Sequence, residues 1–118
     1  MAQKFLIIND ALITGTVEFH KELVREGTKR EDIKGGGWYH WDEEEKVVLF
    51  YSTSQDYGSV TIEEWLEALK SEDTWISPFW DDHKFIFSDR LKLEDVYKQN
   101  GMLTLMQKIM RETQNENE

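Results

Sequence analysis

The chain alternates short apolar runs with polar turns, which is the pattern of a sheet made of short strands. Four runs predict β-strands, at residues 4–8, 38–42, 46–52 and 84–87. The first run ends at Asn9 and Asp10, a pair that is typical of tight turns, and residues 11–14 predict a brief returning strand. An acidic segment at 42–45 joins the second run to the third, so these two predict an antiparallel hairpin.

The strand predicted at residues 46–52 carries apolar side chains in both directions. Its alternation places Val48 and Phe50 on one face and Val47, Leu49 and Tyr51 on the other. A strand that is apolar on both faces belongs inside a sheet, with helices covering both sides. The pattern therefore predicts an α+β fold, a small mixed β-sheet with helices packed on it.

Three further segments have the spacing of helices. Thr61 and Glu64 form a capping box at the start of the clearest one. Apolar residues follow at helical spacing, at Ile62, Trp65, Leu66 and Leu69. Residues 16–27 predict a second helix, capped by a threonine and ended by a glycine. Residues 93–99 predict a third, which stops at an Asn-Gly pair.

Residues 102–110 predict a final helix with a wide apolar stripe. The stripe consists of Met102, Leu103, Leu105, Met106, Ile109 and Met110. Such a stripe usually packs against its own domain, and the alternative is a homodimer seam or partner groove, which the methionines favour. Residues 1–110 are thus expected to form a single α+β domain, and the polar residues 111–118 a disordered tail.

Composition and charge narrow the possible partners and compartments. The 118 residues include 24 Asp and Glu against 14 Lys and Arg, a formal net charge of −10, which disfavours nucleic-acid binding. The chain has no cysteine, which excludes disulfides and thiol catalysis and suits a reducing compartment. No apolar run reaches the roughly 18 residues of a membrane span, so a cytoplasmic protein without membrane partners is expected.

The histidines decide which acid–base or metal chemistry is possible. His20, His40 and His83 lie far apart and lack the spacing of zinc ligands, so neither a metal nor another cofactor is expected. His40 is expected to pack within the hairpin, and His83 to be a solvated loop residue. His20 lies near the predicted start of a helix, where the dipole favours a neutral ring that can act as a base.

Three consecutive glycines, Gly35, Gly36 and Gly37, precede the predicted hairpin. Two interpretations fit them. They form either a flexible hinge between two elements or one wall of an anion site built from successive backbone N–H groups. Small and polar residues close the same hairpin, among them Ser52, Ser54, Tyr57 and Gly58.

Taken together, these segments resemble the janus/ocnus family of phosphohistidine phosphatases over roughly residues 4–69. The order of four motifs carries the resemblance. A lysine opens an apolar strand, a Glu-aromatic-His element follows, a triple glycine precedes a strand, and a Ser-x-x-Tyr-Gly loop closes the series. In this chain these motifs are Lys4, residues 18–20, residues 35–37 and residues 54–58.

The resemblance implies a phosphatase that needs no metal and acts on a phosphorylated protein or a small phosphoramidate. His20 would act as general base or as phosphoryl acceptor, and Lys4 would neutralise phosphate charge. The loop after the hairpin would bind the phosphoryl oxygens through backbone N–H groups and a serine hydroxyl. The implied phosphate-binding residues are Gly35, Gly36, Gly37, Ser52, Ser54, Tyr57 and Gly58.

Two positions favour an alternative function. Trp38 follows the triple glycine where the family commonly has an arginine, and Asp56 stands where it has a small residue. The arginine would bind phosphate in bidentate fashion, whereas a carboxylate would repel it. The alternative is therefore a catalytically inactive binding or interaction protein that retains the phosphohistidine-phosphatase-like fold.

Overall fold

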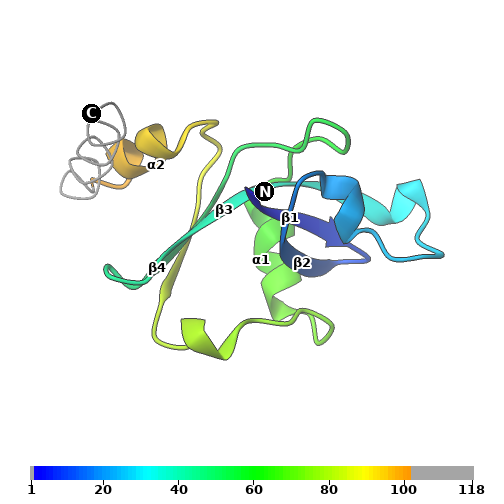
Figure 1. Cartoon of the computed structure of the whole chain (residues 1–118), viewed down its shortest axis with the longest axis horizontal. Coiled ribbons are helices and arrows are strands. Elements are labelled where there is room, and N and C mark those ends of the chain that lie inside the picture. Colours follow the sequence, from blue (N-terminus) through cyan, green and yellow to red (C-terminus); the bar gives the residue numbers. More distant parts are fainter. Residues whose placement is uncertain (1, 102–118) are drawn as a thin grey trace.

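The computed structural model describes residues 2–101, which form a five-stranded sheet with helices on both faces (Figure 1). The strands are β1 (Ala2–Ile8), β2 (Ala11–Val17), β3 (Ile33–Asp42), β4 (Val47–Tyr51) and β5 (Lys84–Phe87). The helices are α1 (Ile62–Lys70) and α2 (Leu93–Gln99), with 3-10 turns η1 (His20–Leu23), η2 (Arg30–Asp32) and η3 (Pro78–Trp80). The strand order is β2-β1-β3-β4-β5, and only the β4–β5 pair is parallel. The predicted α+β class is confirmed.

Most of the predicted elements coincide with observed ones. The four strongest predicted strands lie within or overlap β1, β3, β4 and β5, and the predicted hairpin is the antiparallel β3–β4 pair. The capping box starts α1 as expected, because the Thr61 hydroxyl accepts from the Glu64 N–H at 3.1 Å. In return, the Thr61 N–H donates to the Glu64 carboxylate at 2.9 Å. The helix predicted at residues 93–99 is α2.

The β1–β2 hairpin overturns one prediction. Asn9 and Asp10 have positive φ angles of 51° and 64°, the conformation of a two-residue type I′ turn. This turn sets a register that extends over all seven residues of each strand. The helix predicted over residues 16–27 is therefore wrong, since Thr16 and Val17 belong to β2 and only the short turn η1 follows. The β-branched residues of this stretch suit a strand, and the ladder satisfies their backbone groups.

The sheet has an apolar cluster on each face. Val48 and Phe50 of β4 join the cluster that α1 covers. Val47, Leu49 and Tyr51 join the cluster that α2 covers. The burial predicted for both faces of this strand is confirmed, and the two helices lie on opposite faces of the sheet.

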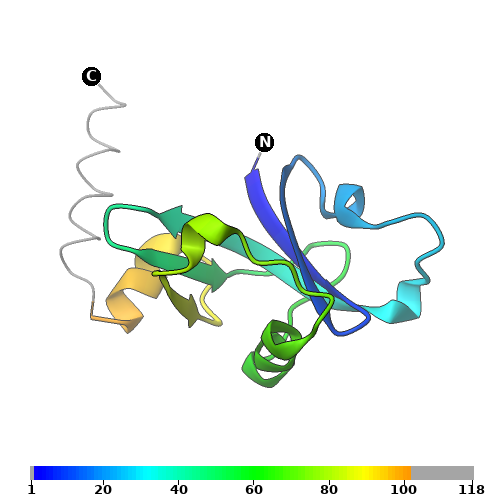
Figure 2. The ribbon, with the colours of Figure 1, turned by 90° about the horizontal axis from the view of Figure 1, so that it is seen from below.

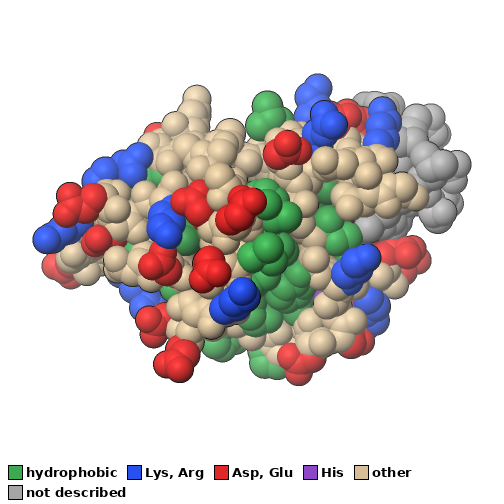
Figure 3. Space-filling model, turned by 180° about the vertical axis from the view of Figure 1, so that it is seen from behind, with side chains coloured by type: hydrophobic (Ala, Val, Ile, Leu, Met, Phe, Trp, Pro, Cys, Tyr) green, Lys and Arg blue, Asp and Glu red, His purple; other side chains and the backbone are tan. Residues whose placement is uncertain are grey.

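The outer side of α1 keeps some apolar surface. Ile62 and Leu66 are 46% and 44% exposed there. The view from behind Figure 1 shows apolar side chains gathered in a band among acidic and basic ones (Figure 3).

Within residues 2–101, no helix is both long and apolar enough to cross a membrane. The apolar stripe predicted over residues 102–110, the homodimer it suggests and the tail predicted at 111–118 lie outside the described residues.

The triple glycine lies inside β3, so the flexible-hinge interpretation is wrong. A Cβ atom added to Gly36 would lie 2.1 Å from the Phe5 carbonyl oxygen of β1. One added to Gly37 would lie 2.4 Å from the Tyr51 carbonyl oxygen of β4. Non-bonded carbon and oxygen atoms do not approach to these distances, so both positions require glycine for β1 and β4 to pack this close to β3. The Gly36 N–H also donates to the Gly58 carbonyl oxygen at 2.9 Å, which fixes the segment after β4 against β3.

Replacing Gly36 tests this close approach. Gly36→Ala should lower the free energy of unfolding by about 3 kcal/mol, because the new methyl group meets backbone that moves only if β1 and β3 separate. Gly15→Ala is the matched control. Its Cβ would meet no backbone, only the ends of two side chains, Leu23 at 2.8 Å and Val17 at 3.9 Å, so the change should cost less than about 1 kcal/mol. Urea unfolding curves measure both, and equal losses in the two variants would contradict the account.

Candidate functional site

One face of the sheet has a row of two partly exposed side chains, Lys4 and Trp38, between two covered ends. Lys4, Trp38 and Tyr51 are paired neighbours on β1, β3 and β4, so their side chains share a face. The turn η1 and the loop over residues 52–58 contribute to the apolar cluster at the β1 end, while α2 covers the β4 end. Figures 1 and 2 both show η1 and α2 well apart along the long axis. The row between them is the candidate site.

His20 is the first residue of η1 and is held by the backbone of the triple glycine. Only 6% of its surface is exposed. Its Nε2 atom lies 2.8 Å from the carbonyl oxygen of Gly37. Because a carbonyl oxygen can only accept, Nε2 carries the proton and donates it to this bond. In the neutral ring the lone pair is then on Nδ1, which makes Nδ1 the atom that can take a proton or attack phosphorus.

The surroundings of His20 favour its neutral form. Burial is the largest influence and lowers the pKa of His20 below its usual 6.5, while the hydrogen bond to Gly37 raises it. The Lys4 ammonium lowers the pKa of His20 further, and the Asp56 carboxylate raises it and is the weakest of the four influences. The ring is therefore neutral at pH 7. The helix dipole expected from the sequence is not the reason, since η1 is a single turn of four residues.

Lys4 supplies the positive charge of the site. Its Nζ donates a hydrogen bond to the carbonyl oxygen of Glu18. Nζ lies 5.6 Å from the centre of the Trp38 ring and 6.0 Å from that of the Phe19 ring, so the ammonium is attracted to both. An ammonium has three N–H donors, so Lys4 keeps donors for a ligand beyond the one it gives to Glu18.

The loop after β4 uses several of its implied phosphate ligands to hold its own shape. Ser54 is only 1% exposed, and its hydroxyl accepts from the Tyr57 N–H at 3.2 Å. The Gly58 N–H donates to the Ser54 carbonyl oxygen at 2.8 Å. Among the described residues, the N–H groups of Gln55 and Asp56 have no hydrogen-bond partner. These two amides at the loop tip are therefore the better donors for an anion.

The other implied phosphate ligands lie in different places. Ser52 has a positive φ of 67° and donates its N–H to the Arg90 carbonyl oxygen at 2.8 Å. Gly35, Gly36 and Gly37 belong to a strand rather than to a loop with converging N–H groups. Of the three, Gly37 meets His20, and it does so through its carbonyl oxygen.

Arg30 is a neighbour of the site that sequence reasoning missed. Its guanidinium donates to the carbonyl oxygens of Ile33 and Asp56, both at 3.4 Å, and lies 4.9 Å from the centre of the Tyr57 ring. Arg30 thus ties η2 to the loop after β4. No local pattern signals this, because the Asp56 contact joins residues 26 positions apart.

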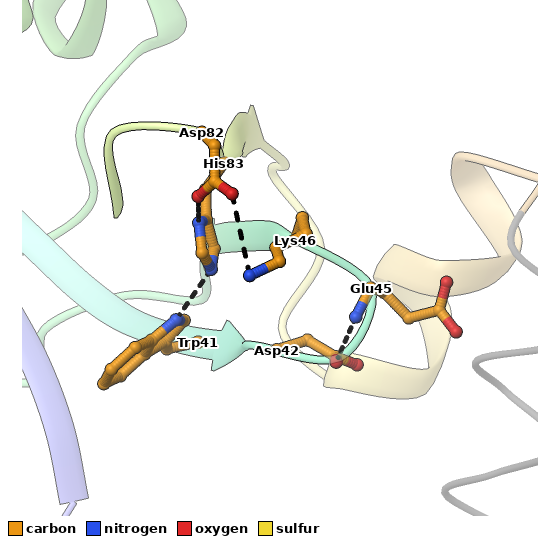
Figure 4. A network of polar contacts seen from close by, with 6 residues as sticks. All are labelled: Trp41, Asp42, Glu45, Lys46, Asp82 and His83. Atoms are coloured by element: carbon orange, nitrogen blue, oxygen red, sulfur yellow. Dashed lines mark hydrogen bonds and ion pairs between the residues drawn. The ribbon is translucent and has the colours of Figure 1, made fainter. Parts of the chain in front are cut away.

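His83 belongs to a separate network, and its predicted solvation is wrong (Figure 4). Its side chain is 1% exposed, and Nε2 accepts from the Trp41 indole N–H at 2.9 Å. Its Nδ1 donates to the Asp82 carboxylate at 2.9 Å, which lowers the pKa of Asp82. Lys46 lies 3.6 Å from the same carboxylate. Both ring nitrogens are used, so His83 joins the β3–β4 hairpin to the segment that leads into β5.

The arrangement combines a neutral imidazole, His20, with an ammonium group, Lys4, that acts on it electrostatically. Such a pair can bind an oxyanion and take a proton, or attack an electrophilic phosphorus atom. Within residues 2–101, no three His, Asp or Glu side chains are grouped as metal ligands would be. No protein-family model, curated protein or solved structure matches this chain.

The protonation of His20 can be measured directly. Long-range ¹H–¹⁵N NMR should show the proton on Nε2 and a pKa below 6.5. Because the unfolded chain binds this proton more readily, the stability due to His20 is full above pH 6.5. That stability is lost as the pH falls from 6.5 towards the lower folded pKa. His20→Gln should remove this part of the pH dependence. A proton on Nδ1, or a pKa above 6.5, would contradict the assignment.

Proposed function

We propose that this protein is a metal-independent phosphatase that acts on phosphohistidine or a related phosphoramidate, with His20 as the reacting histidine. One observation carries the proposal. The Gly37 carbonyl oxygen holds Nε2 at 2.8 Å, so the neutral ring has its lone pair on Nδ1, and the Lys4 ammonium is close enough to lower the pKa of this ring. The resemblance of the motif order to the janus/ocnus family supports the same function.

The reaction would transfer a phosphoryl group from nitrogen to water. In one route Nδ1 of His20 takes a proton from water while the water oxygen attacks phosphorus and the P–N bond breaks. In the other, Nδ1 attacks phosphorus itself, and water then hydrolyses the phosphorylated His20. In both routes the leaving nitrogen gains a proton and phosphate is released. The hydrogen bond to Gly37 would hold the ring in orientation and stabilise the charge that develops on it.

Lys4 would bind the phosphoryl oxygens. The protein as a whole repels anions, with a net charge of −10, so a local cation is needed to hold one. The rings of Trp38 and Phe19 and the Glu18 carbonyl oxygen hold the Lys4 ammonium in place. A fixed charge of this kind requires little reorganisation as the reaction proceeds, which is how electrostatic catalysis works. The N–H groups of the loop tip would add neutral donors.

A catalytically inactive binding protein is the second candidate, and Asp56 favours it. The negative charge of Asp56 reaches His20 and raises its pKa, and the same charge would repel a phosphoryl group. The Asp56 side chain is exposed, so solvent screens this repulsion. Release of phosphate separates the two candidates.

Phosphate release from a phosphohistidine peptide and from phosphoramidate tests the proposal. His20→Ala should lower kcat/KM by about 100-fold or more, the usual contribution of a base or nucleophile. Lys4→Met should lower it by about tenfold or more, because it removes the charge and keeps the stem. The matched controls are His40→Gln, whose ring packs edge-on against Tyr97, and Lys70→Met on the exposed side of α1. Equal rates for wild type and His20→Ala would refute the proposal.

The pH dependence of the same reaction gives a further check. The kcat/KM of the wild type, once corrected for ionisation of the substrate, should be constant above about pH 6.5 and fall at lower pH. The fall reports protonation of Nδ1, so its midpoint should match the pKa of His20 measured by NMR. A midpoint above 6.5 would mean that another group controls the rate.

A further inference from the structure

A groove opens beside Trp38 on the side of α2. Its volume is about 540 Å³, within the range of typical ligand sites and far more than a phosphoryl group fills. Among the described residues, it is lined by Trp38, Tyr51, Ser52, Leu91, Lys92, Leu93 and Glu94. Leu91 is 65% exposed and Trp38 39% exposed, so apolar surface is available to a ligand.

The chemistry of the lining fits a polypeptide better than a small anion. Aromatic and leucine side chains offer apolar contact, and Ser52 offers a hydroxyl that can donate or accept. Lys92 and Glu94 bring one charge of each sign, so the groove has no net attraction for a phosphate group. A peptide chain, with apolar side chains and backbone donors and acceptors, can use all of these groups.

Trp38 connects the groove with the site of His20 and Lys4. On β3 it pairs with Lys4 of β1 on one side and with Tyr51 of β4 on the other. Its ring lies 5.6 Å from the Lys4 ammonium and also lines the groove. A ligand whose phosphoryl group binds at Lys4 therefore reaches the groove by passing over the indole. An imidazole ring between the two would stack on that indole.

We propose that this groove binds the polypeptide segment that flanks a phosphorylated histidine, and that Trp38 is the residue that selects this substrate. The inference rests on the proposed phosphatase function and specifies its substrate, a phosphorylated protein rather than a small phosphoramidate. The tryptophan then has a role of its own beside the triple glycine. It provides a surface for the substrate ring and chain instead of a second phosphate-binding cation.

Comparing a phosphohistidine peptide with phosphoramidate tests binding in the groove separately from catalysis at His20. Trp38→Ala and, separately, Leu91→Asp should raise KM for a phosphohistidine peptide of about ten residues by about tenfold. The rate with phosphoramidate, which does not reach the groove, should change less than about twofold in Leu91→Asp. Leu91 is exposed, so its replacement leaves the fold intact, which circular dichroism would verify. Trp75→Ala, an exposed tryptophan outside the groove lining, is the matched control and should leave both substrates unaffected.

The outcomes distinguish this proposal from the phosphatase proposal. If Leu91→Asp alters the kinetics with neither substrate, or alters them equally with both, the groove does not bind the substrate chain. If the wild type hydrolyses neither substrate, the phosphatase proposal fails, and binding of the phosphohistidine peptide then decides about the groove. Peptide-induced NMR shifts at the Trp38 indole and at residues 91–94 would support the groove. Their absence would overturn it.

Discussion

The close approach of three backbone segments at the triple glycine is the constraint on which the site depends. With no Cβ at Gly36 and Gly37, β1 and β4 come within contact of β3, and the segment at Gly58 hydrogen-bonds to it. The same packing places the Gly37 carbonyl oxygen beside His20 and sets Lys4 opposite Trp38. The glycines thus contribute by lacking a Cβ, which lets the neighbouring strands pack close to β3. The main contribution of Gly37 is an acceptor for His20, where the sequence suggested N–H donors for an anion.

The two faces of the sheet differ in how completely helices and turns cover them. The face under α1 holds the larger apolar cluster, with aromatic rings from β1, β3 and β4 packed at 5.4 to 6.1 Å. On the other face, η1 and α2 cover the two ends and leave the row of Lys4 and Trp38 between them. The net charge of −10 opposes anion binding at long range, so an anion bound at this site would depend on Lys4 and on nearby N–H groups. Burial keeps His20 neutral next to this cation.

Local sequence patterns predicted the fold well where an element depends on its own residues. Alternation identified β4 and its two buried faces, and the capping box of Thr61 located α1. The predictions were wrong where the conformation or burial of a residue depends on a partner far away in the sequence. Residues 16–17 form a strand because they pair with β1. The His83 side chain is buried because it accepts a hydrogen bond from Trp41, which is 42 positions away in the sequence. The order of the motifs suggested His20 and Lys4, but their mutual influence and the tautomer required the structure.

Binding of inorganic phosphate, followed by NMR, tests most directly whether His20 and Lys4 form a phosphoryl site. With the protein labelled with ¹⁵N, phosphate should shift Nδ1 of His20, Nζ of Lys4 and the amides of Gln55 and Asp56, with one common dissociation constant. The ring nitrogens of His83 should not move, since its network is separate from the site. A phosphate response that leaves His20 and Lys4 unchanged, or no response at all, would contradict the account.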